Sequence, residues 1–377
     1  MDYSGQIFHL TTVHNRYDNR ILLKECATLA EYGYDVYILV ADNIPDEVYD
    51  GVNILGAGEK KNKVFSPGIY RDFYGLIKSF RPAVVHFHDL ELVPLMLFVK
   101  LRMRGVTVVY DVHENNVTLI DHKELKASTV VTSLFRVLKP VTKLVVKGLE
   151  KAASRLFNIV IAERYYAERF PGAVPVLNYP KMRSLSSDKN AGGKRLVYTG
   201  NVTLSRGCLE MANIVNLVDD VSVHFIGKCK SETYEMIMEK AGENRSRVFV
   251  EGVDRFVPFS LIEKRYREGW LAGLALFPFS DHYFKKELTK FFEYMLAGLP
   301  VICSDFKAWR DVVEKEGCGI CVDPQNEKQV GEAVRFLLEN PSEAFELGRR
   351  GKRAVWERYN WHIEERKLLG LYDSIID

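Results

Sequence analysis

Between residues 277 and 300 the sequence places a cation and an anion on one face of a short helix. The segment FPFSDHYFKKELTKFFEYMLAGLP predicts a strand end, a polar loop, and a helix up to Ala297 for which Thr289 suits the N-cap. Lys290 and Glu293 are three residues apart and share a helical face. A lysine there suits a phosphate, and a carboxylate that accepts two hydroxyl hydrogens suits a ribose diol. An ordinary surface Lys–Glu pair is the alternative.

Two other polar loops lie between a predicted strand and a predicted helix. In YTGNVTLSRG, Arg206 stands beside a glycine at the start of a helix, which suits a diphosphate. The polar loop 11–20, which contains His14, Asn15 and Arg16, could hold an anion with its arginine side chains and a helix N-terminus. A solvated loop with an Asp18–Arg20 pair is the alternative. No GxGxxG follows this strand, which counts against a dinucleotide-dependent dehydrogenase.

Histidines end two further predicted strands. In VVHFHD, His86 and His88 alternate and so share one face of the strand. Two such histidines could bind a metal, but no HExxH motif or cysteine cluster supplies further ligands, and the sequence predicts no metal site. In YDVHEN, His113 lies near Asp111 and Glu114, where it could orient a sugar hydroxyl or transfer a proton near neutral pH. A histidine that only caps the strand is the alternative.

Alternating β-branched and helix-length amphipathic runs must position these residues, and this alternation predicts parallel sheets covered by helices. In the first series we expect strands at 7–11, 35–41, 83–88 and 106–111, and helices at 21–32, 70–80 and 93–104. A Ser/Lys/Asn/Gly-rich stretch at 180–193 predicts a linker. In the second series we expect strands at 195–199, 222–226, 248–250, 274–277, 300–303 and 319–322, before a long helical end.

Composition agrees with two folded domains, because 377 residues exceed one compact core. The net charge of +2, from 52 basic and 50 acidic residues, provides no field that would attract nucleic acid. The chain begins without a secretory signal pattern, and its most apolar stretch, 269–280, is too short to span a membrane, so we expect a cytoplasmic protein. Cys318 and Cys321 are expected to pack within a strand.

Taken in order, these segments resemble glycosyltransferase family 4, whose members are retaining GT-B glycosyltransferases, especially bacterial enzymes of capsule, lipopolysaccharide or exopolysaccharide assembly. The matching segments are TTVHNRYDNRILLKECATLAEYGYDV, VVHFHD, VYDVHEN, VPVLNYP, YTGNVTLSRG, KFFEYMLAGLPVICSD and GCGICVDP. The resemblance covers nearly the whole chain. It implies an α/β GT-B fold with two Rossmann-like, doubly wound domains facing a central cleft. Residues 1–184 would bind the acceptor, 185–358 the nucleotide-sugar, and the helix 359–377 would cross back onto the N-terminal domain.

The resemblance also implies roles for residues of the second domain. Glu293 is similar to the glutamate that holds the ribose hydroxyls, and Thr289 and Lys290 to the turn that faces the diphosphate. Arg206 corresponds to one of two expected phosphate cations, and Asn201 stands where the family has the other.

Further assignments concern the base, the sugar and the acceptor. Gly252, in VFVEGV, is similar to a glycine near the nucleotide base, and His113 to a histidine near the transferred sugar. The residues expected on the acceptor side are His14, Asn15, Arg16 and His88.

One departure lies eight positions before Glu293, where Lys285 replaces the first glutamate of the family's pair. Glu287, Asp281 or His282 could substitute from the same loop. The Gly-Gly loop of many relatives is missing too, and Asn15 and Arg16 occupy that place.

The resemblance implies transfer of a sugar from a nucleotide-diphosphate sugar, with UDP as the favoured nucleotide, to a hydroxyl of a lipid-linked saccharide or other glycan acceptor, with retention of the anomeric configuration. His113, Arg206 and Lys290 are the predicted catalytic residues, with Arg206 and Lys290 stabilising the charge that grows on the diphosphate. No cofactor or metal is required. A GT-B nucleotide-sugar epimerase and a catalytically silent nucleotide-sugar-binding subunit remain as alternatives. The residues do not select the base, sugar, acceptor, linkage or oligomeric state.

A basic stretch at Lys123–Arg155 predicts contact with an anionic membrane. It contains eight basic residues, Lys123, Lys126, Arg136, Lys139, Lys143, Lys147, Lys151 and Arg155, against Glu124 and Glu150. Apolar residues between them make an amphipathic stripe that could lie on the inner face of the cytoplasmic membrane. A solvated helix face is the alternative.

Overall fold

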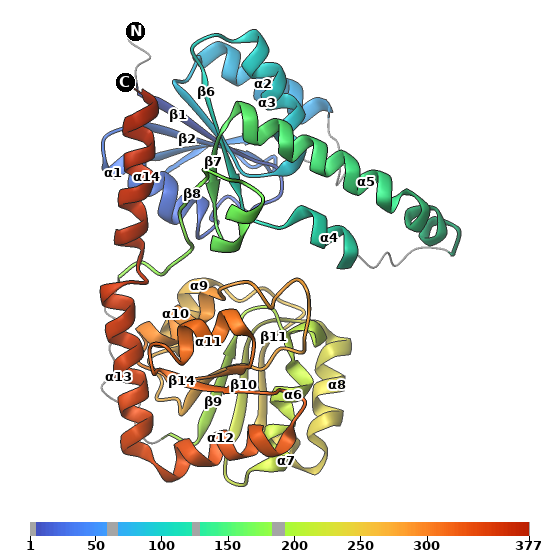
Figure 1. Ribbon diagram of the computed structural model, residues 1–377, viewed down its shortest axis with the longest axis vertical. Coiled ribbons are helices and arrows are strands. Elements are labelled where there is room, and N and C mark those ends of the chain that lie inside the picture. Colours follow the sequence, from blue (N-terminus) through green and yellow to red (C-terminus); the bar gives the residue numbers. More distant parts are fainter. Residues whose placement is uncertain (1–4, 59–66, 123–128, 183–192, 377) are drawn as a thin grey trace. The chain divides into compact units, whose positions relative to one another are not determined.

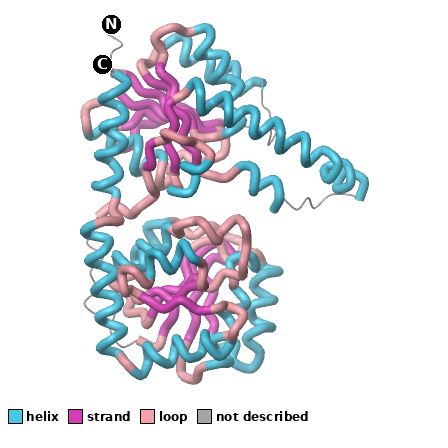
Figure 2. The backbone as a smooth tube through the Cα atoms, in the orientation of Figure 1, coloured by secondary structure: helices cyan, strands magenta, loops and turns pink. Residues whose placement is uncertain are grey.

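A computed structural model describes residues 5–58, 67–122, 129–182 and 193–376 of the chain (Figure 1). The chain divides into two compact units: unit 1 contains residues 1–178 and 361–377, and unit 2 contains residues 179–360. The boundaries expected from the sequence were 184 and 358, and most of the expected linker, 183–192, lies outside the described residues. Each unit is a parallel or mainly parallel sheet with helices on its faces (Figure 2), which confirms the predicted fold class.

Unit 1 is built on an eight-stranded sheet with the order β3-β4-β2-β1-β5-β6-β7-β8. The strands are β1 (Gln6–Thr11), β2 (Asp35–Ala41), β3 (Glu47–Tyr49), β4 (Val52–Ala57), β5 (Val84–Phe87), β6 (Thr107–Val112), β7 (Asn158–Ile161) and β8 (Val174–Pro175). All neighbours are parallel except β3 and β4. The central strands are almost wholly buried because helices cover both faces, which is why they read as continuous apolar runs.

Helices cover the two faces of this sheet in separate sets. One core cluster packs α2 (Pro67–Phe80), α3 (Val93–Arg102) and α5 (Thr129–Leu156) against one face. A second cluster packs the π-helical turn η1 (Ile21–Cys26), its continuation α1 (Ala27–Glu31) and α14 (Trp361–Ile376) against the other face. The short helix α4 (Asn116–His122) follows β6.

The C-terminal helix α14 is part of unit 1 although unit 2 precedes it in the chain. Trp361, Leu368 and Tyr372 are at most 1% exposed within the second cluster. The Trp361 indole donates to the Thr28 hydroxyl (2.9 Å), and the Leu177 amide donates to the Glu364 carboxylate (2.8 Å). The predicted return of the last helix to the N-terminal domain is therefore confirmed.

Unit 2 is built on a six-stranded parallel sheet with the order β11-β10-β9-β12-β13-β14. Its strands are β9 (Arg195–Thr199), β10 (Ser222–Cys229), β11 (Val248–Val253), β12 (Ala272–Ala275), β13 (Val301–Ser304) and β14 (Gly319–Val322). Its α-helices are α6 (Cys208–Ala212), α7 (Ile214–Leu217), α8 (Ser231–Ala241), α9 (Phe259–Arg265), α10 (Thr289–Leu296), α11 (Lys307–Val313), α12 (Glu327–Glu339) and α13 (Pro341–Glu357).

The strand order of each sheet reverses direction at one point. In unit 1, β2 and β4 are added on one side of β1, and β5, β6, β7 and β8 are added on its other side. In unit 2, β10 and β11 are added on one side of β9, and β12, β13 and β14 are added on its other side. Ligands of doubly wound folds bind outside the carboxyl ends of the strands at such points. The loops after β1, β5, β6, β9 and β12 are therefore the places to look for chemistry.

We expect Leu368→Ala to lower the free energy of unfolding of unit 1 by about 2–5 kcal/mol, because it opens a cavity under α14. The exposed neighbour Arg366 provides the control, and Arg366→Ala should change the free energy of unfolding by about 0.5 kcal/mol or less. Urea unfolding, followed by hydrogen exchange of the amides of each unit separately, measures the free energy of unfolding of both variants. Equal effects of the two substitutions would mean that α14 is not needed for the core of unit 1.

Candidate functional site

Two cations of unit 2 lie beside Gly200, at the carboxyl end of β9. An added Cβ on Gly200 would stand 3.7 Å from an Arg206 guanidinium nitrogen and 3.9 Å from Lys290 Nζ. Gly200 has a φ of 103°, a conformation that favours glycine. Lys290 Nζ also lies 5.2 Å from the centre of the Tyr198 ring and 5.3 Å from that of Phe277. The structure thus brings together the two cations that the sequence predicted as a pair.

The environment of Lys290 disfavours its charge. Burial, and then the charge of Arg206, lower the pKa of Lys290 to about 7, while Glu293 opposes the shift. An anion placed between the two cations would remove this repulsion. The pair is therefore a site that gains stability when a polyanion such as a diphosphate binds.

Glu293 is held in place from a neighbouring helix. The Tyr266 hydroxyl donates to Glu293 Oε2 (2.7 Å) and lies 2.7 Å from the Thr199 hydroxyl. The Tyr294 hydroxyl accepts the Thr199 amide (3.1 Å), so the end of β9 is joined to α10. Sequence reasoning missed Tyr266 and Thr199, because no motif spacing links residues that meet only across the sheet.

Thr289 is the first residue of α10, and the predicted N-cap is corrected by one residue. Leu288 occupies the N-cap position, no side chain caps the helix, and the Leu288 carbonyl accepts the Phe291 amide (3.0 Å). The helix starts earlier because this backbone bond already closes its first turn. Lys290 and Glu293 are still three residues apart near the start of α10 and so share one helical face, as predicted.

Other predicted residues of unit 2 lie around this pair in different settings. Asn201 is exposed, and its carbonyl accepts the Tyr198 hydroxyl (2.9 Å). Gly252 has a φ of 113°, and a Cβ there would come within 2.4 Å of the Gly227 carbonyl, so the close approach of β10 and β11 already requires glycine. Lys285, where the family's first glutamate is missing, is exposed.

The three candidate replacements for that glutamate lie in different contacts. Glu287 accepts the Tyr179 hydroxyl (2.8 Å). His282 Nε2 lies 3.4 Å from Lys286 Nζ, and Asp281 is exposed. Tyr283, which the sequence did not single out, accepts the Arg206 Nε–H at 3.2 Å.

In unit 1 the predicted histidines converge at the carboxyl ends of β1, β5 and β6. The His113 ring centre is 4.8 Å from that of His14 and 5.1 Å from that of His88. His113 Nε2 lies 2.6 Å from Asp111 Oδ2, and its side chain is 11% exposed. His113 is thus the partly accessible end of a buried histidine cluster.

The pKa values of two of these histidines shift in opposite directions. Burial lowers the pKa of His88 to about 4, although Asp111 opposes the shift. Burial acts in the same direction on His14, but its hydrogen bond to Asp18 and the charge of Asp89 outweigh burial and raise the pKa of His14. At neutral pH the cluster therefore combines a neutral His88 with a His14 that is more readily protonated.

The predicted anion-binding role of Arg16 does not fit its contacts. Its guanidinium is buried and donates to the Asp42 and Glu47 carboxylates and to the carbonyls of Ile44 and Pro45. Five such hydrogen bonds use all five N–H donors of an arginine. We therefore expect Arg16 to hold the first loop against the segment before β3 rather than to contact a ligand. Asn15 is exposed, and its side chain accepts the Tyr17 amide (2.9 Å).

The basic stretch coincides largely with α5. Lys147, Lys151 and Arg155 are exposed, and Lys139 and Lys143 are partly exposed. Four apolar residues in the described part of the same helix are exposed as well: Val141 (57%), Leu144 (71%), Val145 (55%) and Leu156 (51%). Lys123, Glu124, Lys126 and the side chain of Arg136 lie outside the described residues. Within the described part of the chain, no helix is long and apolar enough to cross a membrane.

Comparison with known proteins adds a family match and a set of similar folds. Residues 289–354, which include Thr289, Lys290 and Glu293, match the family described as "Glycosyl transferases group 1". The chain matches no curated protein sequence.

Among solved structures, the chain resembles sucrose-phosphate synthase from Thermosynechococcus elongatus at a TM-score of 0.73 and 14% identity, over 98% of this chain and 99% of the other. It resembles Anabaena HepE in complex with UDP and glucose at a TM-score of 0.72 and 10% identity, over 98% of this chain and 100% of the other. It resembles WaaG, a glycosyltransferase involved in lipopolysaccharide biosynthesis, at a TM-score of 0.67 and 12% identity, over 96% of this chain and 98% of the other.

The structural matches confirm the predicted GT-B fold over nearly the whole chain. The family match covers α10 to α13, which is the part of unit 2 that carries the Lys290–Glu293 face. Together these findings support the prediction that the chain is a GT-B glycosyltransferase and therefore an enzyme.

Replacing Lys290 tests whether its charge, buried beside Arg206, lowers the free energy of unfolding. Since the pKa of Lys290 is lower in the folded protein than in the unfolded chain, wild-type stability falls as pH decreases from about 10.5 to about 7. We expect Lys290→Met to raise the free energy of unfolding at neutral pH by about 1–3 kcal/mol, and the gain to shrink toward pH 10.

Urea unfolding at several pH values measures this gain, with Lys264→Met, at an exposed site on α9, as the control. A Lys290→Met protein that is less stable than wild type at neutral pH would show that the charge of Lys290 does not destabilise the folded protein.

Proposed function

We propose that the protein transfers a sugar from a UDP-sugar to a hydroxyl of a glycan or lipid-linked saccharide and retains the anomeric configuration. The observation that carries this proposal is the meeting of Arg206 and Lys290 beside Gly200, with Glu293 on the same helical turn as Lys290. All three lie at the reversal point of the unit 2 sheet, where this fold class binds nucleotides. UDP is proposed because HepE, a protein of similar fold, was solved with UDP and glucose.

In the proposed mechanism, the two cations act on the diphosphate. As the bond between the anomeric carbon and the diphosphate oxygen breaks, negative charge grows on that oxygen, and Arg206 and Lys290 stabilise it. Binding of the diphosphate would favour the protonated form of Lys290, which burial and the charge of Arg206 disfavour. Glu293, oriented by Tyr266, accepts the ribose hydroxyls.

Unit 1 is proposed to position the acceptor and the transferred sugar. His113 is the partly exposed member of the histidine cluster, and Asp111 orients its ring. His14 and Asn15 are accessible at the end of β1 and are proposed to contact the acceptor, while the buried His88 supports His113 from behind. The acceptor oxygen would attack the face from which the diphosphate leaves, and its proton would pass to the departing oxygen.

We further propose that α5 brings the protein to the inner face of the cytoplasmic membrane, where lipid-linked acceptors reside. Exposed Val141, Leu144 and Val145 could enter the headgroup region, while the neighbouring cations attract anionic lipid. Each lysine or arginine near such a surface contributes about 1 kcal/mol.

The assignment of Glu293 is tested with Glu293→Gln, which keeps the size of the side chain but removes its charge. We expect UDP affinity to fall by about tenfold or more, because hydrogen bonds from ribose hydroxyls to a charged carboxylate are worth about 1.5–3 kcal/mol. Calorimetry with UDP measures the affinity, and release of UDP from UDP-sugars with a panel of glycan acceptors measures transfer. Glu263→Gln, on α9, is the matched control.

The same assays separate the alternative functions. Wild-type affinity in Glu293→Gln would refute the ribose assignment. Binding of UDP-sugars without release of UDP, across all acceptors, would favour a silent binding subunit. Conversion of a UDP-sugar without any acceptor would indicate an epimerase.

Membrane contact is tested by cosedimentation with vesicles of phosphatidylglycerol and phosphatidylcholine in equal parts. We expect binding at low salt that weakens as salt screens the charges, and much weaker binding to phosphatidylcholine alone. Leu144→Ser should weaken it by several-fold, whereas Phe345→Ser, at an exposed site on α13, should not. No binding of the wild type to anionic vesicles at low salt would overturn the membrane proposal.

A further inference from the structure

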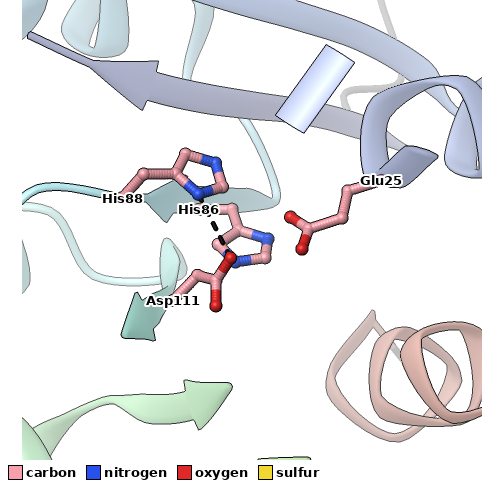
Figure 3. A group of neighbouring side chains, drawn as sticks. All are labelled: Glu25, His86, His88 and Asp111. Atoms are coloured by element: carbon pink, nitrogen blue, oxygen red, sulfur yellow. Dashed lines mark ion pairs between the residues drawn. The ribbon is translucent and has the colours of Figure 1, made fainter. Parts of the chain in front are cut away.

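Four buried side chains of unit 1 direct ligand atoms toward one another (Figure 3). Glu25 comes from η1, His86 from β5, His88 from the residue just after β5, and Asp111 from β6. One ligand atom from each lies within 4.8 Å of those of the other three, and each residue is at most 3% exposed. We propose that these four residues form a binding site for one divalent transition-metal ion.

Unpartnered atoms within the group point to a missing occupant. Neither carboxylate oxygen of Glu25 has a hydrogen-bond partner, although one lies 3.0 Å from the Arg20 guanidinium as an ion pair. His86 Nε2 is also buried without a partner. Buried polar atoms of this kind are rare in native proteins and indicate a missing water, proton or ion. Figure 3 shows the Glu25 carboxylate directed toward the His86 ring.

The surroundings of His86 suit a metal ligand. Its other ring nitrogen, Nδ1, lies 2.8 Å from the buried Tyr372 hydroxyl on α14. When Nδ1–H donates to that hydroxyl, Nε2 carries a lone pair toward the group. Metal-bound histidines commonly have such an outer partner, which selects the tautomer and fixes the ring.

The spacing is close to that of a bound site. In a tetrahedral site, metal–ligand distances of about 2.0–2.2 Å place the donors about 3.3–3.6 Å apart. The ligand atoms of the group lie within 4.8 Å of one another, so side-chain movements of less than about 1 Å each would close them around an ion. Nearby, Arg20 donates to both oxygens of Asp111 (2.9 Å each) and would remain as the outer partner of that ligand.

The donor set selects the class of ion. Two imidazole nitrogens with two carboxylate oxygens suit Zn²⁺, Co²⁺, Mn²⁺ or Fe²⁺, whereas Ca²⁺ and Mg²⁺ prefer oxygen alone. The competing occupant is a proton on Glu25. An ion instead of the proton would join η1, β5 and β6 directly and α14 through Tyr372. The site is structural. It shares Asp111 and His88 with the neighbours of His113, but binding of the ion does not depend on the proposed reaction.

The first experiment uses the wild-type full chain. The protein is unfolded in chelator, then refolded with Zn²⁺, Co²⁺ or Mn²⁺ or without metal, because a fully buried site is loaded during folding. We expect about one ion per chain by mass spectrometry of the metal and a melting temperature several degrees higher than that of the metal-free protein. With Co²⁺, visible absorption bands should report nitrogen and oxygen ligands. Less than about a tenth of an ion per chain with every metal would overturn the proposal.

The second experiment uses variants of the group. Glu25→Gln and His86→Gln should each lower metal affinity by at least about tenfold. His9→Gln is the matched control, because His9 is equally buried and its ring lies 4.6 Å from that of His86, yet it is not one of the four ligands. The control should keep about one ion per chain.

Equal metal loss in all three variants would contradict this ligand set. Should the variants fail to fold, X-ray absorption at the metal edge of the refolded wild type decides the matter: scattering from two imidazoles supports the site, and its absence overturns it.

Discussion

The buried ion pair between Arg20 and Asp111 constrains the whole of unit 1. The Arg20 guanidinium donates to both oxygens of Asp111 and to the Val176 carbonyl, so one side chain joins the start of η1, the end of β6 and the segment after β8. A buried charge without a partner is costly, so these three parts must come together in one arrangement. The next residue, Leu177, donates to Glu364, so the same region also anchors α14.

This ion pair also explains why so many histidines can be buried beside it. The rings of His9, His86 and His88 lie 4.6–5.2 Å apart, and His113 extends the series to the surface. Burial lowers the pKa of each of the three inner histidines, so they stay neutral near neutral pH. Asp111, already paired with Arg20, accepts from His113 and thereby orients its partly exposed ring. A rigid, paired interior thus supports the accessible part of the site.

Unit 1 pairs opposite charges, whereas unit 2 places two positive charges near one another. Arg206 and Lys290 are like charges that both lie beside Gly200, and burial, together with the charge of Arg206, lowers the pKa of Lys290 to about 7. Natural proteins accept such unfavourable groups where a ligand later compensates them. Both units place their chemistry at the reversal point of a sheet, because loops on either side of that point diverge and leave room for a ligand. The same architecture therefore carries a buried, ion-paired cluster in one unit and two neighbouring cations in the other.

The sequence by itself determined what depends on near neighbours in the chain. Periodicity predicted two parallel α/β domains, and helical spacing placed Lys290 and Glu293 on one turn of α10. Most of the central strands were predicted as well, because buried parallel strands are continuous apolar runs. Tertiary structure decided what depends on distant residues. It showed that the Arg16 guanidinium donates to Asp42 and Glu47, and that the Tyr266 hydroxyl donates to Glu293 and orients it.

Tertiary structure also supplied what the two same-face histidines of VVHFHD lacked, namely Glu25 and Asp111 as neighbours. No spacing rule in a single sequence could connect these residues, since they meet only because the strand order sets β6 beside β5 and the packing of η1 brings Glu25 over the sheet. Local geometry follows from the covalent chain, whereas contacts between distant residues follow from which apolar surfaces the folded chain buries together.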